Sequence, residues 1–367
     1  MATALRLRNL DMALGHGDEV RLIPTRWSRF GLAALAVAIL AFPLVFPGDR
    51  WLSVLLFCGA TAIGAVGLNM LTGFTGQVSL GHAFFLGVGA YTTAYLGTTK
   101  GLSIFIWLPA SALLAGLLGL VIGPAALRLK GNYLAVVSLG LLFLGDHIFK
   151  SWRSVTGGAN GISVSPPLAV GPLDFNHINL LGLDLTRNQS LFYLIWPLVA
   201  LTVLVCKNIA RTRPGRAMQA VRDRDVAAEV IGVSIARYKL GAFALSSGLA
   251  GISGALYGVV LQYIEPGTWT LPLSIQFVAM IIIGGVGTIM GGVIGALFVG
   301  ALPEIVNVYS KRIPFVTEGE GFGVTKPQLN QIIFGLLIVV FLVVEPRGVA
   351  ALWLRLKAYL RSWPFSY

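Results

Sequence analysis

The segment RTRPGRAMQAVRDRDVAAEVIGVSIARYK, residues 211–239, holds seven basic and three acidic side chains within 29 residues. The chain around it is apolar, because 56% of its 367 residues are hydrophobic, only 11% are charged, and the mean hydropathy is +0.81. A soluble domain rarely carries so few charges. Apolar runs on both sides of the segment approach the roughly 20 residues that span a bilayer. The sequence therefore predicts an all-α polytopic membrane protein with residues 211–239 outside the bilayer.

Ten apolar runs are long enough to be read as membrane spans. Their approximate bounds are 30–47, 51–71, 79–98, 104–127, 133–149, 190–206, 239–261, 272–289, 291–309 and 328–345. With the amino terminus placed inside, most of the 27 Lys and Arg residues fall in inner segments, as is usual for cytoplasmic loops. We therefore expect both termini to be cytoplasmic and the charged segment to separate two halves of five spans. Halves with an odd number of spans would be inverted relative to each other, as in many transporters.

The predicted organisation has three parts, which are a cytoplasmic tail (1–29), a transmembrane domain (30–346) and a second cytoplasmic tail (347–367). Within the transmembrane domain, residues 150–189 form a periplasmic loop and residues 207–238 a cytoplasmic loop. The formal net charge of +12 is attributed to membrane topology and not to nucleic acid, because membrane proteins collect Lys and Arg on their inner loops. Membrane lipid is the expected surrounding, and no nucleic-acid partner is expected.

Motifs for catalysis, nucleotide binding and metal binding are absent from the sequence. No Lys follows a Gly, which excludes the G-x-x-x-x-G-K-[ST] phosphate loop, and there is no H-E-x-x-H or G-x-S-x-G motif. We therefore expect no enzyme activity, no catalytic residue and no metal site. Ion-coupled transporters often keep a carboxylate at the membrane centre, and no clear one is present here. His82 is the one candidate titrating group within an apolar half.

The segment NMLTGFTGQVSLGHAFFLGVGAYT, residues 69–92, joins the second and third spans and mixes glycines with polar side chains. Non-helical backbone at membrane depth must be buried in protein or line a cavity. One interpretation is a broken helix beside a solute path; the other is a cytoplasmic turn followed by helix packing through small residues. The candidate path or gate residues are Asn69, Thr72, Gln77, Ser79, Gly81 and His82.

Two further segments are rich in glycine. The first, VTGGANGI at residues 155–162, lies in the long outer loop and is typical of a turn that needs positive φ. Its candidate functional residues are Thr156, Gly157, Gly158 and Asn160. The second, IGGVGTIMGGVIGALFVG at residues 283–300, repeats small residues at spacings of three or four, which favours close helix packing.

The charged segment itself has the signals of an ordered element. Pro214 suits the first turn of a helix, Asp223 or Asp225 can cap a second short helix, and Gly232 can end it. Ser234 can then cap the seventh span. Ala227, Ala228, Val230 and Ile231 would give the short helix an apolar face, which suggests a surface that docks a soluble partner. The alternative is a basic loop that only sets topology.

Several of these segments together resemble the LivM-type permease subunit of branched-chain amino acid ABC importers. The matching pieces are TGFTGQVSLGHAFFLGVGAYT, VTGGANGI, AAEVIGVSIARYKLGAFALSSGLAGISGALYG, GGVGTIMGGVIGA and EPRGVAALW. The resemblance implies the permease fold of type II ABC importers. It also implies that the short helix couples to an ATPase. The coupling residues would be Asp225, Val226, Ala227, Ala228, Glu229, Val230, Ile231 and Gly232.

The same resemblance implies the partners and the setting. They are a sister permease (LivH-like), two cytoplasmic ATPase subunits and a periplasmic solute-binding protein, all at the bacterial inner membrane. ATP and Mg²⁺ would bind on the ATPase subunits, so this chain would need no cofactor. The outer turn with Gly157 and Gly158 would contact the binding protein or form an outer gate. The substrate would be a branched-chain or related amino acid, an amide, urea or an aromatic acid. The alternatives are a stand-alone ion-coupled secondary transporter and a passive channel.

Overall fold

The computed structural model describes residues 41–43, 48–127, 133–170, 173–175, 179–180, 183–309, 316–317, 324–345, 348–350, 352 and 355. The chain divides into residues 1–47 and residues 48–367. In the first unit, residues 41–43 are helical. The predicted tail 1–29, most of the predicted span 30–47 and most of the predicted tail 347–367 lie outside the described residues.

The second unit is built almost entirely from helices. The long helices are α3 (Asp49–Thr75), α5 (Ile104–Leu127), α6 (Tyr133–Ser151), α8 (Arg187–Arg211), α11 (Ile235–Leu261), α13 (Ile289–Tyr309) and α14 (Lys326–Val344). The shorter ones are α4 (His82–Thr93) with the π-helix η1 (Ala94–Thr99), α7 (Arg153–Thr156), η2 (Gly158–Asn160), α9 (Arg213–Asp223), α10 (Asp225–Val230), η3 (Pro266–Thr268) and α12 (Leu271–Gly284).

Short strands connect some of these helices. They are β1 (Ile162–Ser163), β2 (Ala169–Val170), β3 (Leu173–Asp174), β4 (Asn179–Leu180), β5 (Leu183–Asp184), β6 (Tyr263–Ile264), β7 (Val316–Thr317) and β8 (Val324–Thr325). Strands β2–β3 and β4–β5 pair as antiparallel hairpins, and β7 pairs in parallel with β8. Strand β1 pairs antiparallel with β6, so the segment after α6 is tied to the segment after α11.

Among the described residues, six helical segments are long and apolar enough to cross a bilayer. A seventh is added if α6 and the helical residues beyond its 82° bend form one span. These helices confirm an all-α membrane protein. The predicted number of ten spans is not confirmed and stays a prediction.

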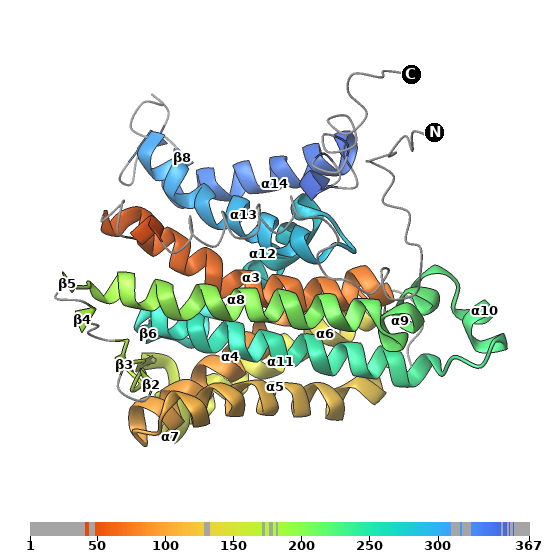
Figure 1. Cartoon of the computed structure of the whole chain (residues 1–367), viewed down its shortest axis with the longest axis horizontal. Helices are drawn as coiled ribbons and strands as arrows, with labels where there is room; N and C mark the ends of the chain where they lie inside the picture. The colour runs from red at the N-terminus through yellow and green to blue at the C-terminus, as the bar shows by residue number, and fades with distance from the viewer. Residues whose placement is uncertain are drawn as a thin grey trace, which may run out of the picture. The chain divides into compact units, whose positions relative to one another are not determined.

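Helix α11 lies at the centre of the packing, with its most extensive contacts to α5, α3 and α4. Figure 1 shows α5 and α11 running along each other over most of their length. Glycines allow the close approach: a Cβ on Gly254 of α11 would collide with the Leu86 carbonyl of α4, and one on Gly89 of α4 with the Gly251 carbonyl. Helix association inside a membrane depends on such small-residue contacts.

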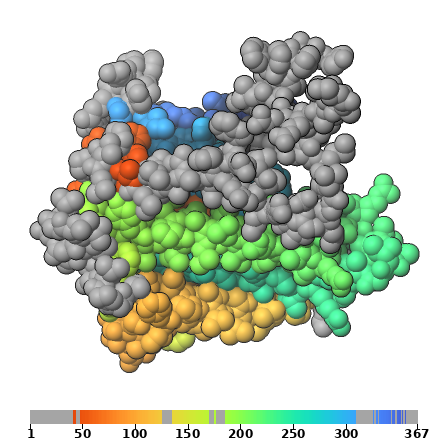
Figure 2. Space-filling model, in the orientation of Figure 1, coloured from red at the N-terminus to blue at the C-terminus, as the bar shows by residue number. Residues whose placement is uncertain are grey.

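The two connections that the sequence singled out lie at opposite ends of this bundle. In Figure 1, α9 and α10 occupy one end, and α7 with the hairpins β2–β3 and β4–β5 occupies the other. The 25-residue helix α8 runs between them, a length of about 37 Å. In the space-filling view, the green α9–α10 segment projects beyond the neighbouring helices (Figure 2). We refer to these as the α10 end and the hairpin end.

Candidate functional site

The α9–α10 segment has the two helices that its sequence predicts. Pro214 lies in the first turn of α9, and Gly232, with φ of 87°, follows α10. Ser234 occupies the N-cap position of α11, but its side chain caps no backbone N–H. The predicted aspartate cap of α10 is wrong, because the N-cap residue is Arg224. The Asp225 carboxylate instead accepts from the N–H of the next residue, Val226, at 2.8 Å.

The exposed side of α10 is apolar, although not with the predicted set of residues. Val226, Val230 and Ile231 are 72%, 83% and 75% exposed, whereas Ala228 is only 2% exposed. The predicted apolar face included Ala228, and the structure corrects this, because the Ala228 side chain packs inward. Three large aliphatic side chains on so charged a segment are costly to leave in water. They indicate a surface that another molecule covers.

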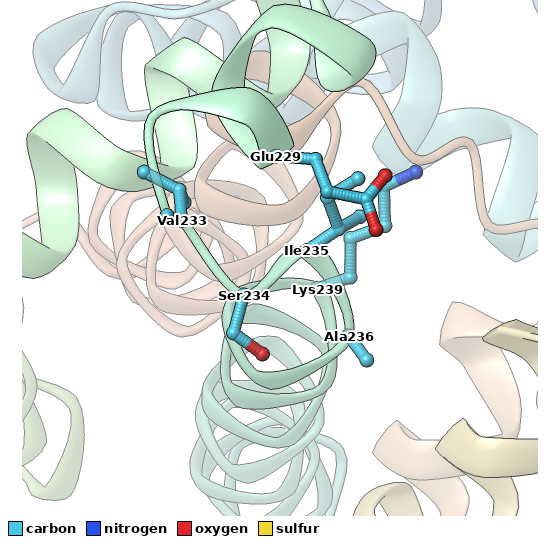
Figure 3. Close-up of a pocket in the computed structure, with 7 residues that line it drawn as sticks. Glu229, Val233, Ser234, Ile235, Ala236 and Lys239 are labelled. Atoms are coloured by element: carbon cyan, nitrogen blue, oxygen red, sulfur yellow. The ribbon is translucent and has the colours of Figure 1, made fainter.

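A groove of about 470 Å³ adjoins these side chains where α10 turns into α11. It is lined by Glu229, Gly232, Val233, Ser234, Ile235, Ala236 and Lys239. Figure 3 shows Glu229 and Lys239 directed to one side of the turn and Val233 to the other. We call Val226, Val230, Ile231 and this groove the α10 surface.

Exposed basic side chains lie on the segments that lead into and out of α10. Arg211, Arg213, Arg216, Arg224 and Arg237 are all exposed. Across residues 211–239, basic groups outnumber acidic ones by seven to three. An apolar ridge with a basic rim suits a protein partner that offers an apolar groove edged by carboxylates, since complementary charge favours encounter and register. Within the described residues no group of His, Cys, Asp and Glu could hold a metal ion.

The segment between α3 and α4 interrupts the helix, as both interpretations of its sequence expected. Helix α3 ends at Thr75 and is capped by Gly76, whose φ of 71° is left-handed and whose N–H donates to the Thr72 carbonyl at 3.1 Å. Residues 76–81 are non-helical, and α4 begins at His82. His82 Nε2 lies 3.1 Å from the carbonyl of Gly64, which is about 16 Å of helix before the end of α3. The connecting backbone therefore re-enters the helix bundle.

The predicted path residues lie inside the subunit. Asn69, Gln77, Ser79, Gly81 and His82 are buried, and Thr72 is partly buried. The Gln77 amide donates to Thr75 Oγ1 at 3.1 Å and to the Lys239 carbonyl at 3.2 Å, and the Thr72 hydroxyl donates to the Gln77 carbonyl at 3.0 Å. Val78, on the opposite edge of the segment, is 43% exposed. The assignment of these residues to a solute path or gate stays a prediction.

Two serines that the sequence did not single out hold the re-entrant backbone. Ser138 Oγ of α6 accepts from the Leu80 N–H at 2.9 Å, and Ser274 Oγ of α12 accepts from the Ala83 N–H at 3.0 Å. Gly81 packs directly on the Ser138 carbonyl, which a Cβ would strike. No local pattern around either serine indicated these contacts.

The glycine-rich turn at the hairpin end closes the bend after α6. Thr156 is 2% exposed. Its hydroxyl oxygen lies 2.6 Å from the Phe149 carbonyl and accepts from the Gly158 N–H at 3.1 Å. Gly157 and Gly158 both have positive φ. Asn160 is exposed, and its carbonyl accepts from the Tyr263 hydroxyl. Thr156 therefore shapes the turn, while Asn160 is accessible to a partner.

Comparison with known proteins gives a consistent assignment. Residues 51–342 match the model of the family described as branched-chain amino acid transport system / permease component. The chain is 28% identical to the high-affinity branched-chain amino acid transport system permease protein LivM of Escherichia coli, over 87% of this chain and 74% of that protein. It is 24% identical to a probable branched-chain amino acid transport permease protein LivH of Methanocaldococcus jannaschii, over 84% of this chain and 94% of that protein. No solved structure matches the chain.

Proposed function

The chain belongs to the family of branched-chain amino acid transport system permease components, and on that premise we propose that it couples ATP hydrolysis on partner subunits to amino-acid import. It is a multi-pass membrane protein and a transport component. The observation that carries the proposal is the α10 surface, which is an exposed apolar ridge beside a groove at one end of the helix bundle. The α9–α10 segment that carries it is joined directly to the long helices α8 and α11.

The proposed partner at the α10 surface is a cytoplasmic ATPase subunit. The residues concerned are Asp225, Val226, Ala227, Ala228, Glu229, Val230, Ile231 and Gly232. Because the sequence has no phosphate loop, ATP and Mg²⁺ would bind on that partner and no cofactor on this chain. The partner must bind two conformations of the permease with different free energies, since otherwise ATP binding would shift nothing.

The remaining parts of the proposal follow from placing the α10 end in the cytoplasm. Both termini would then be cytoplasmic, the membrane would be the bacterial inner membrane, and the hairpin end would face the periplasm. A solute-binding protein would dock there, close to Asn160. A sister permease would complete the translocation unit. The named relatives transport branched-chain amino acids, and we propose that substrate class here.

The α10 surface is tested most directly with Val230→Arg. Val230 is 83% exposed, so the variant should fold and insert normally while a bulky cation blocks docking. We expect loss of ATPase co-purification from membranes and loss of ATP-dependent leucine uptake in proteoliposomes. Ser163→Arg is the matched control, because Ser163 is exposed at the hairpin end, and it should retain ATPase co-purification.

Two results would count against the proposal. One is a Val230→Arg complex that keeps its ATPase subunits and its uptake. The other is leucine uptake by the chain that persists without ATP. Dependence on an ion gradient would then favour a secondary transporter, and uptake independent of any gradient a passive channel.

A further inference from the structure

The short turn between α12 and α13, residues 285–288, is held against the last turns of α3. Asn69 Oδ1 accepts from the Gly287 N–H at 2.8 Å, and Asn69 Nδ2 donates to the carbonyls of Thr288 at 2.8 Å and Gly285 at 3.2 Å. Gly73, one turn further along α3, has no room for a Cβ, which would lie 2.6 Å from Gly287 Cα. Two backbones are therefore in direct contact here.

Arg222, in the last turn of α9, reaches this contact from the α10 end. Its Nη1 donates to the Gly73 carbonyl at 2.7 Å. A Cβ on Gly287 would lie 3.2 Å from the same nitrogen, so the guanidinium borders the turn as well. Asp223 orients the group, because its Oδ1 lies 2.9 Å from Arg222 Nε and 2.8 Å from Nη2.

This arrangement gives α9 a connection that the covalent chain does not supply. Along the chain, α9 and α10 lead only into α8 and α11. Arg222 adds non-covalent contact with α3 and with the α12–α13 turn, which are distant in sequence. The contacts at Gly73 and Gly287 involve backbone atoms, so no flexible side chain on the receiving side can absorb a displacement of α9. Gly348 also packs on this turn, because its Cβ would lie 2.6 Å from Gly285 Cα.

We propose that Arg222 is a positioning residue through which movement of α10 reaches α3 and the α12–α13 turn. It acts on these backbones without touching solute or nucleotide. The inference rests on the proposed function, because it assumes that a partner moves α10. The proposal adds a contact through which movement of α10 reaches helices other than α8 and α11. It also assigns a role to Asp223, which holds the Arg222 guanidinium in the orientation that bonds Gly73.

The test uses the complete transporter, reconstituted with its ATPase subunits and binding protein, and measures ATP hydrolysis and leucine uptake in the same vesicles. In Arg222→Gln we expect the ATPase subunits to remain bound and hydrolysis to continue. Uptake per ATP should fall about tenfold, within the 5–150-fold range typical of coupling between sites. Arg222→Lys should recover part of the loss, because a lysine can still donate to the Gly73 carbonyl.

Two further variants separate this role from a structural one. Arg50→Gln is the control at the opposite end of α3, where the Arg50 side chain is 70% exposed and its Nε lies 3.2 Å from Glu304 Oε1, and it should leave uptake per ATP unchanged. Asp223→Asn keeps the arginine but weakens its orientation, and it should give an intermediate loss.

Unchanged uptake per ATP in Arg222→Gln would overturn the inference. An equal loss of assembly, hydrolysis and uptake would also overturn it, since that would show a role in folding alone. Failure of the proposed function is distinguishable, because there the unmodified chain would bind no ATPase, or Val230→Arg would have no effect.

Discussion

Replacing Gly254 with alanine should destabilise the protein, whereas the same replacement at Gly241 in the same helix should not. A Cβ at Gly254 would lie 2.6 Å from Leu86 Cα, while ordinary contacts begin near 3.4 Å. Helices α4 and α11 would have to separate by about 1.5 Å, because the Leu86 carbonyl oxygen lies closer still to the added Cβ, and such overpacking costs about 1–3 kcal/mol. At Gly241, nothing lies within 4 Å of an added Cβ. In both variants the change from glycine to alanine adds about 1 kcal/mol of helix propensity. The difference between their free energies of unfolding is therefore the cost of overpacking at Gly254.

The two buried free cysteines provide the assay. Cys58 and Cys206 are both 0% exposed, so a thiol-reactive fluorogenic dye should label the detergent-solubilised protein only as it unfolds. Gly241→Ala should unfold at or above the temperature of the unmodified protein. Gly254→Ala should unfold below it, by a few degrees. If Gly254→Ala is as stable as Gly241→Ala, then the α4–α11 contact is not the tight backbone contact described above.

Two further predictions concern polar contacts inside the bundle. Asn69→Leu should lower the unfolding temperature more than Asn69→Asp, because leucine removes the acceptor of the Gly287 N–H and the amide donor to the Thr288 carbonyl, at about 1–3 kcal/mol for a buried group left unpaired, while aspartate keeps the acceptor for Gly287. Equal stability of the two variants in the dye assay would contradict this. Ser138→Ala should leave the Leu80 N–H without its acceptor. Hydrogen–deuterium exchange of residues 76–81 should therefore be faster in Ser138→Ala than in Ser138→Thr, which keeps a hydroxyl. Equal exchange in the two variants would show that Ser138 does not hold the segment.

Local features of the fold were predictable from the sequence. The starts and ends of helices depend on neighbouring residues, which is why Pro214 and Gly232 correctly marked α9 and α10. Glycines and polar side chains likewise indicated the interruption before His82. Such signals have limits even locally: the aspartate cap was wrong, because Asp225 bonds the adjacent N–H instead of an N–H further into the helix.

Contacts between distant segments were not predictable in this way. Asn69 was singled out as a path residue, yet its partners lie in the turn at residues 285–288. Arg222 was counted only among the seven basic residues of the charged segment, although its Nη1 donates to the Gly73 carbonyl. Helical periodicity and capping report on residues within about one turn. They do not say which helices pack against each other. The packing of the helices determines which groups the Asn69 amide and the Arg222 guanidinium can bond.

The glycine packing of the core and the proposed role of Arg222 depend on each other. A displacement at α10 can act at the hairpin end only if the intervening helices move as rigid bodies, since a deformable layer would dissipate it. Backbone contact at Gly89 and Gly254 removes such a layer between α4 and α11, and close-packed interfaces switch between discrete arrangements instead of deforming continuously. By contrast, Gly140 of α6 and Gly335 of α14 have no atom within 4 Å of an added Cβ, so no other described part of the chain packs closely on them at these positions. Helices α4 and α11 would therefore move as one rigid unit. Arg222 would link this unit to α10, because it bonds the Gly73 carbonyl of α3 and α3 packs extensively on α11.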